Sequence, residues 1–339
     1  MDDLVAGLLN PGDNERLIFL RGLLRSEAVD ADDPKSAGVF VLQKLQRVVQ
    51  ERKTLGARAA DVKPSSPLDR GSLFRDRGVS LDTSIIPDFS IEQALRDLKQ
   101  RGVLREGQVA RVAVIGPGLD FIDKNEDSAY DYYPQQTVQP FALYDSLMRL
   151  KLAEASGASI SIFDISSRVI QHIQRARERA YKDVGFVVQL PRDIARPGPP
   201  ELIGFWISLG CQVGTAIRPI APPRIFPGLE TRAVRIRPEV ILACQPMDLN
   251  IVLERLNQAP ADRFDLIVGT NIFVYYDAFE QTLALENAGA MLKPGGLLLT
   301  NDRLPAAPGG SMQLAGVTVV PFDAPGVSAR QAVGWYRKQ

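Results

Sequence analysis

The chain is poor in the side chains that most often bind structural metals, form disulfides or transfer protons. Its 339 residues include only two cysteines, Cys211 and Cys244, and a single histidine, His172. The cysteines are far apart and have no Cys-x-x-Cys spacing, which argues against a disulfide framework or a structural zinc site and fits a reducing compartment. His172 falls at the border of the apolar stripe of a predicted helix, so we expect a structural role rather than a general base. We expect no bound metal.

The sequence also lacks an excess of charge of either sign and a long apolar run. Forty basic and forty acidic side chains cancel to a net charge of zero, so no overall field favours nucleic acid or an anionic membrane. No stretch approaches the roughly 18 uninterrupted apolar residues of a membrane span, and residues 1–9 lack a positively charged lead-in to an apolar run. We therefore expect a cytoplasmic protein that acts on a small molecule, with no nucleic-acid or membrane partner. Nothing in the sequence indicates an oligomeric state.

What the sequence does contain is a change of pattern near residue 108. Before that point, apolar residues recur at the spacing of amphipathic helices, and Ser90 with Gln93 resembles a capping box at the start of a helix that ends near Gly102. After it, short apolar runs alternate with helical patterns, which predicts a parallel sheet with helices on both faces. The predicted strands are 109–115, 160–163, 240–244, 264–269 and 297–300, and the runs 317–322 and 332–337 predict an antiparallel hairpin at one edge.

We therefore predict two regions. Residues 1–107 form a helical cap or lead-in, and residues 108–339 form a doubly wound, Rossmann-like α/β domain. Two connections in this domain are longer than usual. One follows the first strand, and the other, at about 183–238, is rich in proline and predicts an insertion.

Polar residues follow four of the predicted strands, at the edge where open α/β sheets bind ligands. The turn Gly116-Pro117-Gly118 would let the backbone pass close to a ligand, or simply make a tight turn. Asp164 is placed to accept hydrogen bonds from both hydroxyls of a ribose, or to cap a helix. Asp248 is placed to accept a hydrogen bond from an exocyclic amine such as that of adenine, or to cap its loop. Thr270-Asn271 forms a polar elbow after the fourth strand.

Taken in this order, the segments resemble the class I S-adenosylmethionine (SAM) methyltransferases. The more specific parts are Phe264-Asp-Leu-Ile267 and Leu292-Lys-Pro-Gly-Gly-Leu-Leu-Leu299, a pair that dinucleotide dehydrogenases do not usually carry. The resemblance covers residues 109–339 and implies a seven-stranded, mostly parallel sheet whose final strand, 332–337, is antiparallel. It also implies SAM as the cofactor.

By this resemblance, the glycine turn contacts the methionine part of SAM and Asp164 binds the ribose. Asp248 and Leu249 flank the adenine, and Thr270-Asn271 borders the reacting methyl. The family often has an acid two places before the first glycine and a third glycine two places after the second, where this chain has Val114 and Asp120. Asp120 is therefore a candidate partner for the ammonium of the cofactor. The predicted cofactor-binding residues are Gly116, Pro117, Gly118, Asp120, Asp164, Ile165, Asp248, Leu249, Thr270 and Asn271.

Methyl transfer from a sulfonium needs mainly positioning, exclusion of water and, for a hydroxyl or amine acceptor, a base. No side chain stands out as catalytic. Aromatic side chains face a cation favourably, so tyrosines near the predicted site are candidates for the substrate pocket. The candidates are Tyr130, Tyr132, Tyr133 and Gln136 in the first long connection, and Tyr275 and Tyr276 after the fourth strand.

Three other functions stay open. Asn271-Ile-Phe-Val-Tyr-Tyr-Asp277 is similar to a segment of chemotaxis receptor methyltransferases, which would make the acceptor a protein carboxylate. A non-catalytic cofactor-binding protein would also fit the motifs. An NAD-dependent oxidoreductase fits less well, because the third glycine and a Tyr-x-x-x-Lys or histidine proton relay are missing.

Overall fold

The main body of the protein is built on a seven-stranded sheet. The computed structural model describes residues 2–12, 14–43, 46, 85–118, 137–154, 158–191, 198–219, 231–322 and 330–339. The strand order in the sheet is β6-β2-β1-β7-β8-β10-β9. The strands are β1 (Arg111–Ile115), β2 (Ser159–Asp164), β6 (Cys244–Asp248), β7 (Phe264–Gly269), β8 (Leu292–Thr300), β9 (Met312–Pro321) and β10 (Arg330–Lys338).

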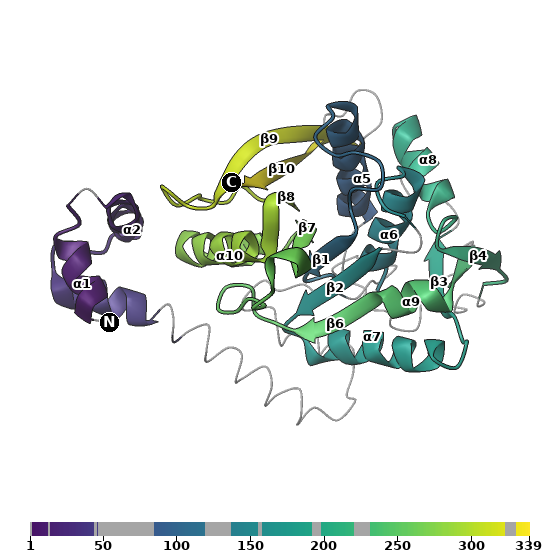
Figure 1. The fold of residues 1–339 in the computed structure, drawn as a ribbon, viewed down its shortest axis with the longest axis horizontal. Helices are drawn as coiled ribbons and strands as arrows, with labels where there is room; N and C mark the ends of the chain where they lie inside the picture. Colours follow the sequence, from purple (N-terminus) through teal and green to yellow (C-terminus); the bar gives the residue numbers. More distant parts are fainter. Residues whose placement is uncertain are drawn as a thin grey trace, which may run out of the picture.

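The pairing of these strands confirms the predicted doubly wound topology. β6, β2, β1, β7 and β8 are parallel, whereas β10 is antiparallel to both β8 and β9. The antiparallel last strand lies between β8 and β9, so β9 forms the edge of the sheet (Figure 1). The carboxyl ends of the parallel strands therefore meet along one side of the sheet.

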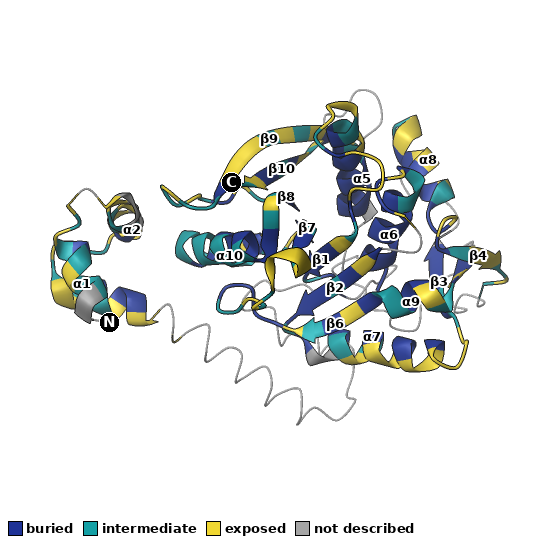
Figure 2. Ribbon diagram, in the orientation of Figure 1, coloured by how far each residue is buried: buried dark blue, intermediate teal, exposed yellow. Residues whose placement is uncertain are grey.

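Two helical layers cover the sheet because successive side chains of a strand point to opposite faces. In β1, Val112 and Val114 join the core beneath α5 (Ile85–Gln100), α6 (Gln139–Arg149) and α7 (Ser167–Ala180). Ala113 and Ile115 join the other core, beneath α10 (Ala278–Met291). The central strands β1, β2 and β7 are accordingly buried, whereas most of β9 is exposed (Figure 2).

Two of the sequence-based predictions are wrong. The run 240–244 is not a strand: Pro238–Ala243 forms the short helix α9, and strand β6 begins only at Cys244. Pro238 begins that helix because its fixed φ suits the first turn, and an apolar run does not by itself distinguish a buried helix from a buried strand. Ser90 does not cap a helix either, since α5 begins at Ile85 and the Ser90 hydroxyl lies inside it, 3.3 Å from Gln331 Oε1.

Two local signals of the sequence are seen in the structure, and the first of them confirms a prediction. The helix that was predicted to end near Gly102 ends at Gln100, and Gly102 adopts φ +72°, the left-handed conformation that commonly follows a helix. Asp277 and Glu280 form a capping box at the start of α10. Both signals depend on neighbouring residues only, which is why sequence pattern identifies them.

Within the stretch 183–238 lies a second, three-stranded antiparallel sheet of order β3-β5-β4. Its strands are β3 (Phe186–Pro191), β4 (Gly214–Ile217) and β5 (Thr231–Ile236), and α8 (Pro200–Ser208) lies between β3 and β4 in the chain. The apolar side chains of β3, β5 and α8 join the same core as α5 and α6. The division of the chain at residue 107 and the insertion stay predictions.

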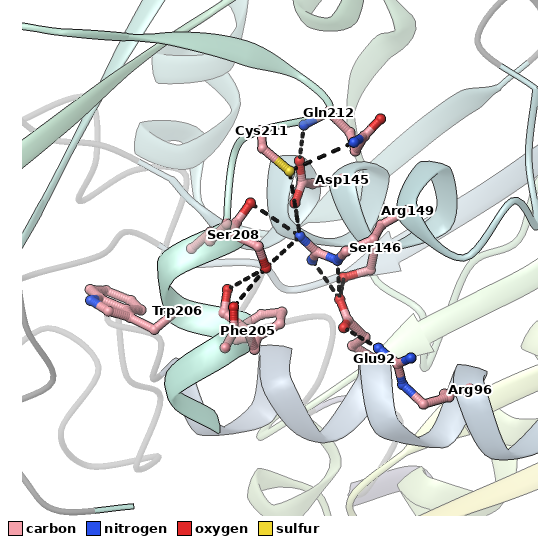
Figure 3. A network of polar contacts seen from close by, with 12 residues as sticks. Glu92, Arg96, Asp145, Ser146, Arg149, Phe205, Trp206, Ser208, Cys211 and Gln212 are labelled. Atoms are coloured by element: carbon pink, nitrogen blue, oxygen red, sulfur yellow. Dashed lines mark hydrogen bonds and ion pairs between the residues drawn. The ribbon is translucent and has the colours of Figure 1, made fainter. Parts of the chain in front are cut away.

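A buried polar network holds this second unit against the helical layer (Figure 3). The guanidinium of Arg149 on α6 binds Glu92 on α5 at 2.5 Å and lies 2.9 Å from Asp145 on its own helix. It also donates to the carbonyl of Ser208, at the end of α8. Asp145 in turn accepts from the backbone N–H of Gln212, just before β4.

The N-terminal helices form a small core of their own. α1 (Asp2–Leu9), α2 (Glu15–Ser26) and helical residues 34–43 bury Leu8, Leu24 and Val41 among themselves. These helices meet the main body at α10: α2 lies against that helix, and the ring of Phe40 lies edge-on to Phe279 at 6.3 Å between centroids. None of the helices that the structure describes is long and apolar enough to span a bilayer.

Candidate functional site

A pocket opens at the carboxyl ends of β1, β2 and β6, where the topology predicts a ligand. It combines the glycine turn, the end of β2, the segment after β6 and the aromatic segment after β7. Its lining residues are Ile115, Gly116, Gly118, Phe163, Asp164, Ile165, Ser166, Val169, Leu249, Ile251, Ile272, Tyr275 and Tyr276.

The two glycines of the turn have a left-handed backbone conformation, which other residue types adopt only with strain. Gly116 and Gly118 have φ of +61° and +67°. A Cβ at Gly116 would lie 2.7 Å from Cδ1 of Ile272, and the Gly116 N–H donates to the carbonyl of Phe163 at 2.7 Å. Pro117 sits between the two glycines and is buried, but it does not line the pocket. The turn thus leaves space where a side chain would otherwise fill the pocket wall.

Asp164 is the buried acid of the pocket. Its side chain is 8% exposed, and its Oδ1 accepts the backbone N–H of Ser166 at 2.7 Å. Burial raises the pKa of Asp164 to about 7, the nearby charge of Asp248 adds to the rise, and backbone N–H groups including that of Gly118 oppose it. The carboxyl group therefore titrates near neutral pH, and a ligand that donates hydrogen bonds would favour its ionised form.

Asp248 and Leu249 lie next to Asp164 across the sheet. Asp248 ends β6 and is paired in register with Asp164, and its side chain is exposed. The next residue, Leu249, is buried, lines the pocket, and donates its N–H to the carbonyl of Asp164 at 3.3 Å. Asp248 itself is at the margin of the pocket rather than in its wall.

Thr270 and Asn271 follow β7 but do not line the pocket. Thr270 is buried and its hydroxyl accepts from Gln139 Nε2 at 2.7 Å. Asn271 has φ +55° and exchanges hydrogen bonds with Asn301, the residue after β8. Asp302 accepts the N–H of Phe273, so the loop after β8 holds the segment that presents Tyr275 and Tyr276 to the pocket.

Some site predictions fall where the structure gives no description, and some site residues were not predicted. Asp120, Tyr130, Tyr132, Tyr133 and Gln136 lie outside the described residues. Sequence reasoning missed the apolar wall and Gln139. The missed apolar residues are Ile115, Phe163, Val169, Ile251 and Ile272, and the polar residue Ser166 also lines the pocket.

The two most specific motifs meet at the opposite end of the sheet. Lys293 Nζ binds Asp265 Oδ1 at 2.6 Å, and Asp265 Oδ2 accepts the N–H groups of Ala110 and Arg111. Asp265 lies near the start of β7 and Lys293 near the start of β8. These motif residues therefore fix strand register at the amino ends of the strands and do not contact the pocket. In the described ranges, no group of three metal-binding side chains is clustered.

Comparison with known proteins finds structural likeness without sequence likeness. No model of a protein family matches the chain, and no curated protein matches it. Among solved structures, it is similar to the N-methyltransferase NodS from Bradyrhizobium japonicum WM9, with 13% identity, 73% of this chain and 93% of that chain covered, and a TM-score of 0.34.

Two further structures give values in the same range. For magnesium protoporphyrin IX methyltransferase ChlM from Synechocystis PCC 6803 with bound SAM, the identity is 9%, the coverage 82% and 100%, and the TM-score 0.35. For MtNAS in complex with MTA and tNA, the identity is 10%, the coverage 100% and 96%, and the TM-score 0.30. These values are low, so the likeness by itself assigns neither an activity nor a substrate.

Proposed function

We propose that the protein is a SAM-dependent methyltransferase that binds the adenosine part of SAM in the pocket at the carboxyl ends of β1, β2 and β6. The observation that carries this proposal is the pairing of a side-chain-free turn at Gly116 with a buried carboxyl group, Asp164, across one pocket. The pocket belongs to a seven-stranded sheet whose last strand is antiparallel.

The residues present fit this cofactor. A ribose offers two hydroxyl donors, and Asp164 offers a carboxylate with acceptor sites left beyond its backbone hydrogen bonds. The buried side chains of Leu249 and Ile251 suit the flat apolar faces of an adenine. When bound, SAM supplies a methyl group on a positively charged sulfur. The chain would contribute binding, orientation and exclusion of water.

We further propose that the acceptor is a small molecule that enters beside Tyr275 and Tyr276. Both rings line the pocket and are partly exposed, so they form part of its accessible wall. Aromatic faces stabilise a nearby cation, and the sulfonium is a cation.

Calorimetric titration with SAM, S-adenosylhomocysteine (SAH) and NADH tests the cofactor. We expect binding of SAM and SAH and none of NADH, and Asp164→Ala should weaken SAH binding by about 10-fold or more because two hydroxyls lose a charged acceptor. NADH binding in place of SAH would instead support an oxidoreductase.

Product analysis tests the reaction. Incubation with SAM and a panel of small amines, phenols and carboxylates should release SAH. Release of 5′-methylthioadenosine would contradict methyl transfer, because it means that another carbon left the sulfur. Binding of SAM with no product from any acceptor, a protein carboxylate included, would favour a non-catalytic cofactor-binding protein.

A further inference from the structure

We propose that Gln139, the first residue of α6, and Thr137, two residues before it, bind the ammonium of the amino-acid part of SAM. This inference rests on the proposed function and assigns a part of the cofactor that the pocket around Asp164 leaves without a partner.

Gln139 is tied to the strand end beside the glycine turn. Its Nε2 donates to Thr270 Oγ1 at 2.7 Å in a contact buried from solvent. Ile115 is paired in register with Gly269, so the next residues along the two parallel strands, Gly116 and Thr270, are neighbours. Adjacent strands are about 4.8 Å apart. The Gln139 amide therefore lies one strand away from the pocket wall.

Two polar atoms in this place have no partner. Within the part of the chain that the structure describes, Gln139 Oε1 and Thr137 Oγ1 are among the buried side-chain atoms that make no hydrogen bond. The two residues are 2% and 1% exposed. Leaving a buried polar atom unpaired costs about 1 to 3 kcal/mol. Two such atoms two residues apart in the sequence, one of them on a side chain that binds the strand end beside the glycine turn, point to a ligand that supplies donors.

The chemistry of these atoms selects the ammonium. The amide oxygen of Gln139 accepts hydrogen bonds, and the hydroxyl of Thr137 both accepts and donates. An alkylammonium has three N–H donors, and it is the strongest donor group in SAM. Val114, at the position where the family often has an acid, is fully buried in the core under α5 and α6 and has no acceptor in its side chain. The other candidate for this role, Asp120, lies outside the described residues. We therefore assign the ammonium to the two neutral acceptors, Gln139 and Thr137.

Two ligands separate this subsite from the rest of the pocket. SAH carries the amino-acid part, whereas 5′-methylthioadenosine has the same adenosine and sulfur without it. We expect Gln139→Leu to weaken SAH binding by about 10- to 100-fold, as for loss of a hydrogen bond to a charged group, and to change 5′-methylthioadenosine binding by less than about 2-fold. Gln139→Glu should retain or improve SAH binding because a carboxylate also accepts from an ammonium.

Calorimetry on the full chain gives both affinities, with Thr137→Val as a second variant and Gln189→Leu as the control. Gln189 is equally buried but lies on β3, in the other sheet, so its variant should leave both affinities unchanged. An equal loss for both ligands in Gln139→Leu, or no loss for SAH in either Gln139→Leu or Thr137→Val, would overturn the subsite. Wild-type protein that binds neither ligand would instead overturn the proposed function.

Discussion

At the scale of single residues, burial of the Asp164 carboxyl group lowers the free energy of unfolding at neutral pH, and a ligand would offset this loss. Its folded pKa of about 7 is raised above the ordinary 3.8 because the side chain is buried. In the unfolded chain this carboxyl group ionises near pH 3.8, whereas in the folded protein it stays protonated up to about pH 7. The cost is therefore absent below about pH 4, grows as the pH rises from 4 to 7 and stays constant above that. A ligand that donates to the ionised form offsets this cost.

We predict that Asp164→Asn stabilises the ligand-free protein at pH 8 by on the order of 2 to 4 kcal/mol and has little effect at about pH 3.5. Asparagine keeps an acceptor for the N–H of Ser166 and carries no charge. Urea unfolding at the two pH values measures the difference. Asp183→Asn is the control, since Asp183 is exposed and its φ of +59° is one that asparagine tolerates. Equal stability of Asp164→Asn and wild type at pH 8 would contradict the prediction.

His172 should contribute a loss of stability in mild acid, opposite in sign to the contribution of Asp164. Burial lowers its pKa from 6.5 to about 4, and the positive charges of Arg179 and Arg175 add to the effect. The imidazole packs edge-on against Phe186, with ring centroids 5.4 Å apart, and its buried Nε2 makes no hydrogen bond within the described chain. Because the folded protein holds the neutral form, stability is present above about pH 6.5 and is lost as the pH falls towards 4.

We predict that His172→Gln removes much of this pH dependence, which amounts to up to about 3 kcal/mol between pH 7 and pH 4. Chemical unfolding at a series of pH values measures it. Gln174→His provides the matched comparison, because it places a histidine at an exposed position of the same helix and should add no such dependence. A His172→Gln profile that runs parallel to the wild-type profile between pH 7 and 4 would show that the protonated imidazole is accommodated.

Sequence predicted the site residues whose position follows from strand ends, and missed those whose position follows from packing. Asp164 follows an apolar run, so its place at the ligand edge is a local property. Gln139 is different: its partner Thr270 is 131 positions away, and nothing near Gln139 in the sequence marks it. Asp265 shows the converse, because it belongs to a specific sequence motif and yet holds strand register far from the pocket.

At the scale of helices and strands, Arg149 is the side chain on which the packing of α5, α6 and α8 depends. It compensates two carboxylates, Glu92 and Asp145, that are 2% and 0% exposed. Burial raises the pKa of Asp145 despite the nearby guanidinium. Removal of one partner from a buried ion pair leaves an uncompensated charge, which is far more damaging than loss of an exposed pair.

We predict that Arg149→Met destabilises the protein by about 3 to 5 kcal/mol in urea unfolding. Arg96→Met is the matched control: Arg96 also binds Glu92, at 3.0 Å, but its side chain is 45% exposed, so the loss should stay below about 1 kcal/mol. Similar effects of the two substitutions would mean that solvent reaches the carboxylates when Arg149 is absent.

Element boundaries show where local pattern stops being sufficient. The start of β6 was predicted too early because Val240 and Ile241 are buried in helix α9, and burial on a short helix gives the same apolar run as burial on a strand. Pro246 lies inside β6, paired with Ile162, a position that argues against a central strand. β6 is an edge strand, where proline is tolerated, and only the topology reveals this.

At the scale of the whole molecule, the two cores of the main sheet and the core of the N-terminal helices differ in how they are connected. Both faces of the main sheet share the same strands, so neither core persists without the other. The N-terminal core contains Leu8, Leu24, Ala31, Ala37, Phe40 and Val41 and meets the main body at Phe279. A core with so few buried side chains is expected to open independently and at low free energy.

We predict that Phe40→Ala abolishes slow amide hydrogen exchange in residues 2–43 and leaves exchange in β1, β2 and β7 unchanged. Phe40 is 7% exposed and provides both part of the small core and the edge-on contact with Phe279, so its truncation removes about 3 to 5 kcal/mol from a unit that has few other buried side chains. Val39→Ala is the control in the same helix, because Val39 is 43% exposed and its truncation creates no cavity. Hydrogen exchange followed by mass spectrometry resolves the two regions. Faster exchange in β1 and β7 along with the N-terminal helices would mean that the chain unfolds as one cooperative unit, in which case the contact between Phe40 and Phe279 couples the cores rather than merely joining them.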